Sequence, residues 1–361
     1  MKLNIVGYLG FENFGDDLML TGLLDELNRN GIFQINLFVK NKVSLNGYAT
    51  RWSNLKICLI TLSKLSTILL PYYILTASKT IWCGGTCLYE DPSDPRFRGL
   101  GWIRRVVNYT RLFGRKFLLM NIGVNQIISK EAKTIIGEIV AGKSTYISVR
   151  DITSLENLLS VSSMRNSVVL GADLAFLNRI NSVRSSSETD YIIFCGHRQY
   201  ANNSEIVDFY AQTLSKISKT LNKKIVMISL HGGVVGDDLF HISIRERMDC
   251  TVMCIQYSSD AINILSNLFS NCFCIISMRL HGLIFAELLM KPSIGIAYSD
   301  KVKYFIEKTN NISNYRIKKV KETLTPEEVI LVTESYKVSS SFIDAERALS
   351  KVGIDKLLHL N

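Results

Sequence analysis

Two residues that could bind an anion and move a proton, Arg279 and His281, lie two positions apart in the segment IISMRLHGLIFAELLM, residues 275–290. The segment predicts a short buried strand followed at once by a helix with an apolar face. Ligands bind at this kind of junction because unpaired N–H groups and the positive end of the helix dipole meet there. A guanidinium and an imidazole at that edge suit a phosphorylated or carboxylated substrate. The competing interpretation is that both residues cap the helix and bond loop carbonyls.

A glycine-rich loop follows the first apolar strand, residues 2–8, and precedes a segment with helical periodicity. Glycines in such a loop let backbone N–H groups approach a ligand closely. The spacing differs from GxGxxG, and two aspartates at the helix start would repel a pyrophosphate. We interpret these aspartates as helix caps first and as ligands of acceptor hydroxyls second. The glycines and polar residues of the loop are Gly7, Gly10, Asn13, Gly15, Asp16 and Asp17.

Two further strand ends carry residues of interest. The strand at residues 79–82 ends in CGGTCLYED, where Gly84 and Gly85 would bring a second loop to the same sheet edge as the first. The strand at residues 146–151 ends with Arg150, which can anchor a substrate or pair with a neighbouring aspartate. Taken alone, we interpret Arg150 as structural.

Strands and helices alternate along most of the chain, a pattern typical of parallel α/β sheets. A polar, serine-rich segment at residues 178–190 indicates a linker. We therefore predict an α/β protein with two Rossmann-like domains that face each other across a cleft, and we expect the donor site between them. The predicted parts are an N-terminal domain on the acceptor side (1–180), a C-terminal domain on the donor side (190–310) and a helical tail that packs back on the first domain (311–361).

Composition and charge limit the function classes. Hydrophobic residues make up 47% of the 361 and charged residues 20%, which is globular composition. The net charge of +10 favours an acidic partner: a phosphorylated small molecule, an anionic membrane surface or nucleic acid. Basic residues are not interleaved with aromatics and no zinc-finger spacing occurs, so nucleic acid is the least favoured of the three.

Eight scattered cysteines lie mostly in apolar segments, with no ligand pairs at metal-site spacing. We expect reduced thiols, no metal and a cytoplasmic protein. The amino terminus resembles no signal peptide. The longest apolar run, residues 65–77, is too short to span a bilayer and predicts a core helix. We also keep open that it contacts the inner face of the cytoplasmic membrane, because Lys56, Lys64 and Lys79 border it and it contains two tyrosines.

Seven motifs together resemble the polysaccharide pyruvyl transferases, and they occur in family order between residues 7 and 305. They are GYLGFENFGDDLML, GGTCLYED, SVRDITSLENL, GADLAF, GHR, SMRLHGLIFAELL and IAYSDKVKYF. The resemblance implies a fold like that of the GT-B glycosyltransferases, no metal or other cofactor, and phosphoenolpyruvate as co-substrate. It implies transfer of pyruvate as a ketal onto two hydroxyls of a sugar in a bacterial surface polysaccharide, such as a capsule or exopolysaccharide, or in its precursor. Whether that acceptor is lipid-linked stays open.

The resemblance also assigns roles to residues. It implies that His281 is the acid/base residue, with Arg279 and Arg150 as catalytic anion ligands. A helix amino terminus favours the neutral imidazole and a bound phosphate favours the imidazolium, so donor binding could itself arm the acid. We expect the donor to contact Arg279, Lys301, Arg150, Arg198 and Gly282. We expect the acceptor to contact Asn13, Asp16, Asp17, Gly84, Gly85 and His231.

Two other functions compete with this one. A nucleotide-sugar-dependent GT-B glycosyltransferase would need a carboxylate for the ribose late in the second domain, and Glu287 is the candidate. A non-catalytic binding protein of the same fold is opposed by the intact set of Arg150, Arg279, His281 and Lys301. His197, Asp237 and Asp238 lie on loops after strands and join His231 as acceptor candidates. We interpret His241 as a surface residue of a helix.

Overall fold

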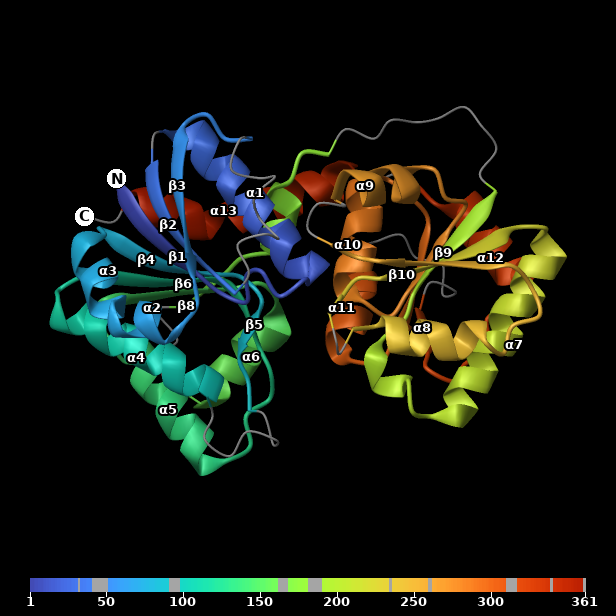
Figure 1. Ribbon diagram of the computed structural model, residues 1–361, viewed down its shortest axis with the longest axis horizontal. Coiled ribbons are helices and arrows are strands. Elements are labelled where there is room, and N and C mark those ends of the chain that lie inside the picture. Colours follow the sequence, from blue (N-terminus) through green and yellow to red (C-terminus); the bar gives the residue numbers. More distant parts are fainter. Residues whose placement is uncertain are drawn as a thin grey trace. The chain divides into compact units, whose positions relative to one another are not determined.

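The structure is a computed structural model that describes residues 1–31, 33–40, 51–90, 98–161, 168–180, 190–233, 236–258, 262–309, 317–337 and 340–359. The chain divides into two compact units. The first unit contains Met1–Phe11, Asp16–Asn178 and Asp344–Asn361, and the second contains Glu12–Gly15 and Arg179–Ile343. Both are Rossmann-like, as Figure 1 shows for each unit by itself.

The first unit is built on a parallel sheet in the order β3-β2-β1-β4-β6-β7-β8, with β5 pairing with β6. Its described strands are β1 (Lys2–Val6), β2 (Phe33–Val39), β3 (Leu55–Thr61), β4 (Lys79–Cys83), β5 (Thr86–Leu88), β6 (Lys116–Val124), β7 (Thr145–Val149) and β8 (Val168–Leu170). Their runs of apolar residues fit a sheet that is buried on both faces.

Helices cover both faces of this sheet (Figure 1). One face carries α1 (Phe14–Asn30) and α13 (Ser340–His359). The other carries α2 (Lys64–Ile68), α3 (Leu70–Thr76), α4 (Arg98–Leu112), α5 (Lys130–Val140) and α6 (Ile152–Val161). Among the helices described, none is long and apolar enough to cross a membrane.

The second unit has a parallel sheet in the order β11-β10-β9-β12-β13-β14. Its described strands are β9 (Tyr191–Cys195), β10 (Lys224–Ser229), β11 (Val252–Gln256), β12 (Ile275–Ser277), β13 (Ser293–Ala297) and β14 (Ile317–Lys319). Its described α-helices are α7 (Ser204–Leu221), α8 (Asp238–Arg245), α9 (Ile262–Ser270), α10 (Leu280–Leu288), α11 (Asp300–Lys308) and α12 (Pro326–Ser335). Local sequence sets both ends of α7. Asn203 caps its start by accepting from the Ile206 N–H, and Asn222 ends it in the left-handed conformation.

The residues predicted to form one helical tail are divided between the units. Strand β14 extends the second sheet beside β13, and α12 contacts α7. From Asp344 onward α13 belongs to the first unit, where the Ser350 hydroxyl donates to the Asp173 carbonyl at 2.8 Å. The buried Lys79 ammonium also donates to the Leu357 carbonyl, 2.5 Å away. Of the predicted linker, residues 181–189 lie outside the described part of the chain.

Candidate active site

Three of the residues predicted to bind the donor, Arg198, Arg279 and Gly282, follow the two strands at which strand order reverses in the second sheet. Strands β9 and β12 are parallel neighbours, with Cys195 opposite Ser277 at their carboxyl ends. The loop after β9 carries Arg198, and Arg279 follows β12. Such a switch point leaves a crevice at the carboxyl ends of the strands, which is where open α/β sheets bind ligands.

One buried carboxylate ties the loops of this edge together. Asp237 has no exposed surface, and it accepts from Arg279 through both carboxylate oxygens, with Nε 2.9 Å from Oδ2. It also accepts from the Arg198 and His231 N–H groups, each at 3.1 Å. The bidentate pair fixes the plane of the guanidinium. Sequence reasoning gave Asp237 no such role, because nothing in the sequence shows which of several loop aspartates faces an arginine on another loop.

The same edge is rich in positive charge. Burial, together with the neighbouring Arg279, Lys301 and Arg198, lowers the pKa of His197 to about 3, while Asp237 opposes the shift. Burial also lowers the pKa of His231, again with contributions from Arg279 and Arg198. Both imidazoles are therefore held neutral beside cations. A bound anion would offset the positive charge of Arg279, Lys301 and Arg198 at this edge. The electrostatics therefore favour a phosphate or carboxylate ligand.

An aromatic ring organises part of this cationic group. The His197 and Tyr298 rings lie with centroids 4.4 Å apart, and the Lys301 Nζ lies 5.7 Å from the Tyr298 centroid. The second distance is within cation–π range. Tyr298 thus positions Lys301 on the same side of the unit as His197.

His281 is the second residue of α10, and its imidazole packs directly against Gly15. A Cβ atom on Gly15 would lie 2.6 Å from His281 Cγ and would overlap with Nδ1. The short segment Glu12–Gly15 belongs to the second unit, because the Phe14 N–H donates to the Leu230 carbonyl at 2.9 Å. A bridge between Asn13 and His231 adds to this attachment. Gly15 is therefore a glycine because His281 occupies the place of a side chain.

Gly282 has a similar explanation. A Cβ atom there would meet Ser277 Oγ at 2.5 Å, and the Ser277 hydroxyl donates to the Arg279 carbonyl at 2.8 Å. The Gly282 amide donates to the same Arg279 carbonyl at 3.1 Å. Its small size allows the tight turn that presents Arg279, and its direct contact with the donor stays a prediction.

In the first unit, the two glycine-rich loops follow β1 and β4, which border the switch point of that sheet. Gly84 and Gly85 have left-handed φ values of 52° and 70°. A Cβ atom on Gly84 would meet Met19 Sδ at 2.6 Å, and one on Gly85 would meet Asp16 Oδ1 at 3.2 Å. The second loop therefore packs against the first turn of α1, where Asp17 is also buried. This places the predicted acceptor residues Asp16, Gly84 and Gly85 together.

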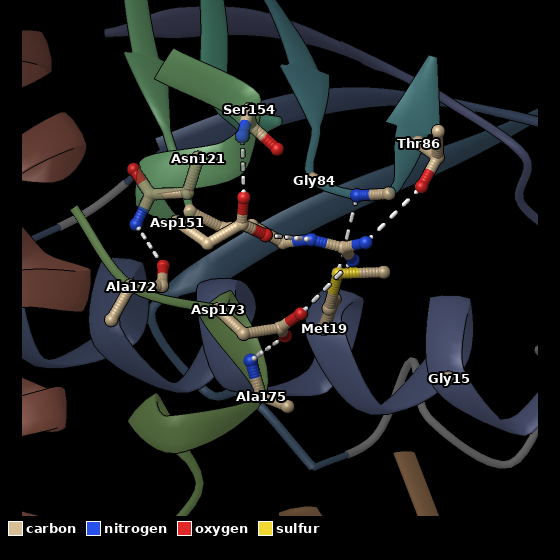
Figure 2. Close-up of polar contacts among 12 residues, drawn as sticks. Gly15, Met19, Gly84, Thr86, Asn121, Asp151, Ser154, Ala172, Asp173 and Ala175 are labelled. Atoms are coloured by element: carbon tan, nitrogen blue, oxygen red, sulfur yellow. Dashed lines mark hydrogen bonds and ion pairs between the residues drawn. The ribbon is translucent and has the colours of Figure 1, made fainter. Parts of the chain in front are cut away.

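Arg150 lies in the first unit, at the end of β7, and is buried among acceptors. Its Nε donates to Asp151 at 3.2 Å, Nη1 to Asp173 at 3.3 Å and Nη2 to Thr86 at 3.1 Å. Figure 2 shows these three partners around the guanidinium. Two carboxylates thus balance its charge. Arg150 shares its unit with Asp16, Asp17, Gly84 and Gly85, whereas Asn13, Arg198, His231, Arg279, His281, Gly282 and Lys301 belong to the second unit.

His241 was predicted to be a surface residue, and this is wrong. It has no exposed surface, and the Gly196 N–H donates to its Nε2 at 2.8 Å. Nε2 is therefore the acceptor, so Nδ1 carries the proton and faces Ser229 Oγ at 2.9 Å. Through these two bonds, His241 links the loop after β9 to the end of β10, beneath the cationic edge. Burial lowers the pKa of His241 to about 4.

A cavity of about 750 Å³ in the first unit contains none of the predicted site residues. It lies between the β6 and β7 strands and α13, and its lining includes Met120, Ile147 and Val352. We do not assign the reaction to it, because its walls are largely apolar and it lies away from the switch point. In the described residues no group of three His, Cys, Asp or Glu side chains is placed to hold a metal ion.

Glu287, the candidate ribose ligand of the competing glycosyltransferase function, is not presented at the switch point. It is 1% exposed within α10, and its Oε2 accepts from the Tyr336 hydroxyl at 3.2 Å. The carboxylate therefore serves the packing of α10 in this structure.

Solved structures with the same fold cover the whole chain at low identity. UDP-GlcNAc 2-epimerase from Methanocaldococcus jannaschii gives a TM-score of 0.65 at 12% identity, with 100% of each chain covered. UDP-GlcNAc 2-epimerase from Neisseria meningitidis bound to UDP-GlcNAc gives 0.61 at 10%, and Anabaena Alr3699/HepE in complex with UDP-glucose gives 0.61 at 11%, again with 100% of each chain covered. They show the fold, which is a two-domain Rossmann-like fold of the GT-B type.

No curated protein matches the chain. The model of the family described as polysaccharide pyruvyl transferase matches residues 13–300, which include Gly84, Gly85, Arg279 and His281. The chain therefore belongs to the polysaccharide pyruvyl transferase family and is an enzyme with that activity.

Proposed function

We propose that this enzyme transfers pyruvate from phosphoenolpyruvate onto two hydroxyls of a sugar in a bacterial surface polysaccharide or its precursor, forming a ketal. The observation that carries the proposal is the cationic edge of the second unit. There Arg198, Arg279 and Lys301 surround neutral imidazoles, with the buried Asp237 opposing them. Phosphoenolpyruvate carries a phosphate and a carboxylate, so it suits such an edge. With this donor the reaction belongs in the cytoplasm.

The reaction needs one proton delivered and two removed. An acceptor hydroxyl oxygen bonds to C2 of the donor and loses its proton, while C3 takes up a proton and becomes a methyl group. A second hydroxyl oxygen then bonds to C2 and loses its proton as phosphate leaves with the electrons of its bond to C2. An acid near C3 and cations near the phosphate lower these barriers.

We assign the proton transfers to His281 and the anion contacts to Arg279, Lys301, Arg198 and Gly282. Support for His281 comes from its fixed place against Gly15 at the start of α10. Support for Arg279 comes from Asp237, which holds its plane while other N–H groups of the guanidinium point elsewhere. Arg150 joins this set only if its bonds to Asp151 and Asp173 exchange when the donor binds.

We assign the acceptor to Asn13, Asp16, Asp17, Gly84, Gly85 and His231. Carboxylates and an amide are suitable partners for sugar hydroxyls, because each hydroxyl can donate to an oxygen atom. The structure supports this assignment for Asp16, which lies beside Gly85 in the first unit. A lipid-linked acceptor would also bring the enzyme to the inner face of the cytoplasmic membrane.

The test is to incubate the purified chain with phosphoenolpyruvate or with UDP-sugars, together with a panel of glycosides. We expect phosphate release that depends on the glycoside, and a product whose mass exceeds that of the acceptor by pyruvate minus water. Arg279→Ala should lower turnover at low donor concentration by about one to two decades. Arg247→Ala is the matched control, since this arginine of the same unit pairs with Asp208 on α7. Release of UDP without any ketal would refute the proposal and establish the glycosyltransferase.

A further inference from the structure

Helices α2 and α3 of the first unit present a row of apolar side chains to solvent. The exposed stripe consists of Leu65, Ile68, Leu69, Tyr72 and Leu75, which are 64%, 73%, 38%, 58% and 46% exposed. Their spacing of three or four residues is that of one face of a helix. Other residues of the same helices, Leu70 and Ile74, are buried in the core of the unit. The segment is thus apolar toward both the core and the solvent, which corrects the prediction of a core helix at residues 65–77.

Such a row of exposed apolar side chains is unusual within the molecule. The described residues include fourteen exposed large hydrophobic side chains, and five of them fall in these eleven consecutive residues. Single exposed leucines are normal on a protein surface, whereas a contiguous row marks a contact surface. The exposed stripe therefore needs a partner.

The charge of the chain is concentrated around the same segment in the sequence. Residues 27–130 contain fifteen Lys and Arg against three Asp and Glu, a net charge of +12. The rest of the chain has 27 Lys and Arg against 29 Asp and Glu, a net charge of −2. No acidic residue occurs between Glu26 and Glu90. The excess positive charge of the protein thus comes entirely from the sequence around α2 and α3.

Several basic side chains adjoin the exposed stripe. Arg115 donates to the Leu75 carbonyl at 2.9 Å, and Lys2 Nζ lies 3.4 Å from Thr76 Oγ1 at the end of α3. Lys64, at the start of α2, is exposed one helical turn before Ile68. Lys56 is exposed on β3, eight residues before Lys64 in the sequence. Lys79 does not take part, because its ammonium is buried against α13. An apolar row with cations around it complements an anionic lipid surface.

We propose that the exposed stripe docks the first unit on an anionic bilayer surface, with the basic residues contacting lipid phosphates. Helices of five and seven residues are too short to span a bilayer, so they lie in the plane of the interface. Leu65 and Ile68 enter the boundary of the acyl chains. Tyr72 lies at headgroup level, where its ring is apolar and its hydroxyl stays wet.

The test is flotation of the full chain with vesicles of phosphatidylcholine, with and without phosphatidylglycerol, at low and high ionic strength. We expect binding to the anionic vesicles at low salt and a loss on adding salt, because screening weakens the attraction to lipid phosphates. The triple variant Leu65→Ser, Ile68→Ser, Tyr72→Ser should bind about tenfold more weakly, since three apolar insertions are lost. All three side chains are exposed, so circular dichroism should show an unchanged fold.

Matched controls isolate the exposed stripe from general effects. The triple variant Leu239→Ser, Ile264→Ser, Leu331→Ser removes three exposed apolar side chains of the second unit and should bind like the wild type. Lys56→Glu with Lys64→Glu should abolish binding, whereas Lys216→Glu with Lys224→Glu should reduce it less than twofold. Because the assay does not use turnover, its result is independent of the proposed reaction.

Three outcomes would overturn the proposal. One is absence of binding to anionic vesicles at low salt. Another is binding that charge alone explains. This would be seen as equal vesicle binding by the wild type and the stripe variant, or as equally tight binding of both proteins to heparin. The last is self-association in sedimentation velocity that the stripe variant abolishes without any vesicle binding, which would assign the stripe to a second copy of the chain.

Discussion

The buried imidazole of His241 should make the second unit unstable in mild acid. Its pKa is lowered to about 4 by burial, with Arg279 adding to the shift and Asp237 opposing it. An unfolded chain binds a proton at this histidine below its ordinary pKa of about 6.5, whereas the folded chain does so only below about 4. Between those two values the unfolded state binds more protons, so stability falls as the pH falls.

The size of the effect follows from the width of this window. Each pKa unit corresponds to about 1.4 kcal/mol, so a shift from 6.5 to about 4 makes the free energy of unfolding about 3 kcal/mol lower at pH 4 than at pH 7. Stabilities of single domains are about 5–15 kcal/mol, so the loss is a large share of the total. The variant His241→Gln keeps an acceptor for the Gly196 N–H and does not titrate, so it should lack this loss.

The assay uses urea denaturation at several pH values, followed by two signals. Far-UV circular dichroism reports both units, whereas tryptophan fluorescence reports the first unit alone, because Trp52, Trp82 and Trp102 all belong to it. The wild type should lose about 3 kcal/mol of its free energy of unfolding relative to His241→Gln between pH 7 and pH 4 when circular dichroism is followed. When tryptophan fluorescence is followed, the difference between the two proteins should stay constant. His359→Gln, at the exposed end of α13, is the matched control. A difference that does not change with pH would refute the reasoning.

Three other predictions concern contacts of the candidate site. His281→Ala should slow turnover at saturating donor by about two to four decades with donor affinity kept, whereas Arg279→Ala should weaken donor binding by about one to two decades, and calorimetry beside steady-state rates separates the two. Gly15→Ala should displace the imidazole and lower kcat at least tenfold, while the control Gly137→Ala, a helical glycine with open space around it, should retain full activity. Phe14→Ala should lower the free energy of unfolding by about 3–5 kcal/mol in urea titrations, because this ring is fully buried; a change under 1 kcal/mol would contradict that packing.

Much of the fold followed from periodicity. The strands predicted at residues 2–8, 79–82 and 146–151 are observed as β1, β4 and β7, with ends that differ by at most two residues. Strand β3 was missed because its polar and apolar residues do not alternate strictly, as its mixed burial shows. Strand β14 was missed because Ile317–Lys319 has almost no apolar signal and is defined by pairing with β13. Elements that depend on a neighbouring strand cannot be read from their own residues.

From the sequence, a residue of the candidate site could be predicted only where its position at the end of a strand places it at the site. The position of Arg279 and His281 after β12 was predicted because strand ends in parallel sheets converge on one edge. The roles of Asp237 and His241 were not found, since each depends on partners from other loops. The two carboxylate partners of Arg150 fit its interpretation as a structural residue. Its role as an anion ligand, which the family resemblance implies, stays a prediction. That the two units enclose the donor also stays a prediction.

The glycines near both switch points make room for functional side chains, which explains their departure from a dinucleotide fingerprint. In GxGxxG loops the glycines let the backbone approach a pyrophosphate. Here a Cβ atom on Gly15 would overlap with His281, and one on Gly123 would lie 2.9 Å from Arg150 Nη2. In the proposed reaction the anion would therefore be bound by guanidinium and imidazole groups that pack against glycines. Such an edge suits the charge of the phosphoenolpyruvate donor that we propose, which has no base or ribose to hold.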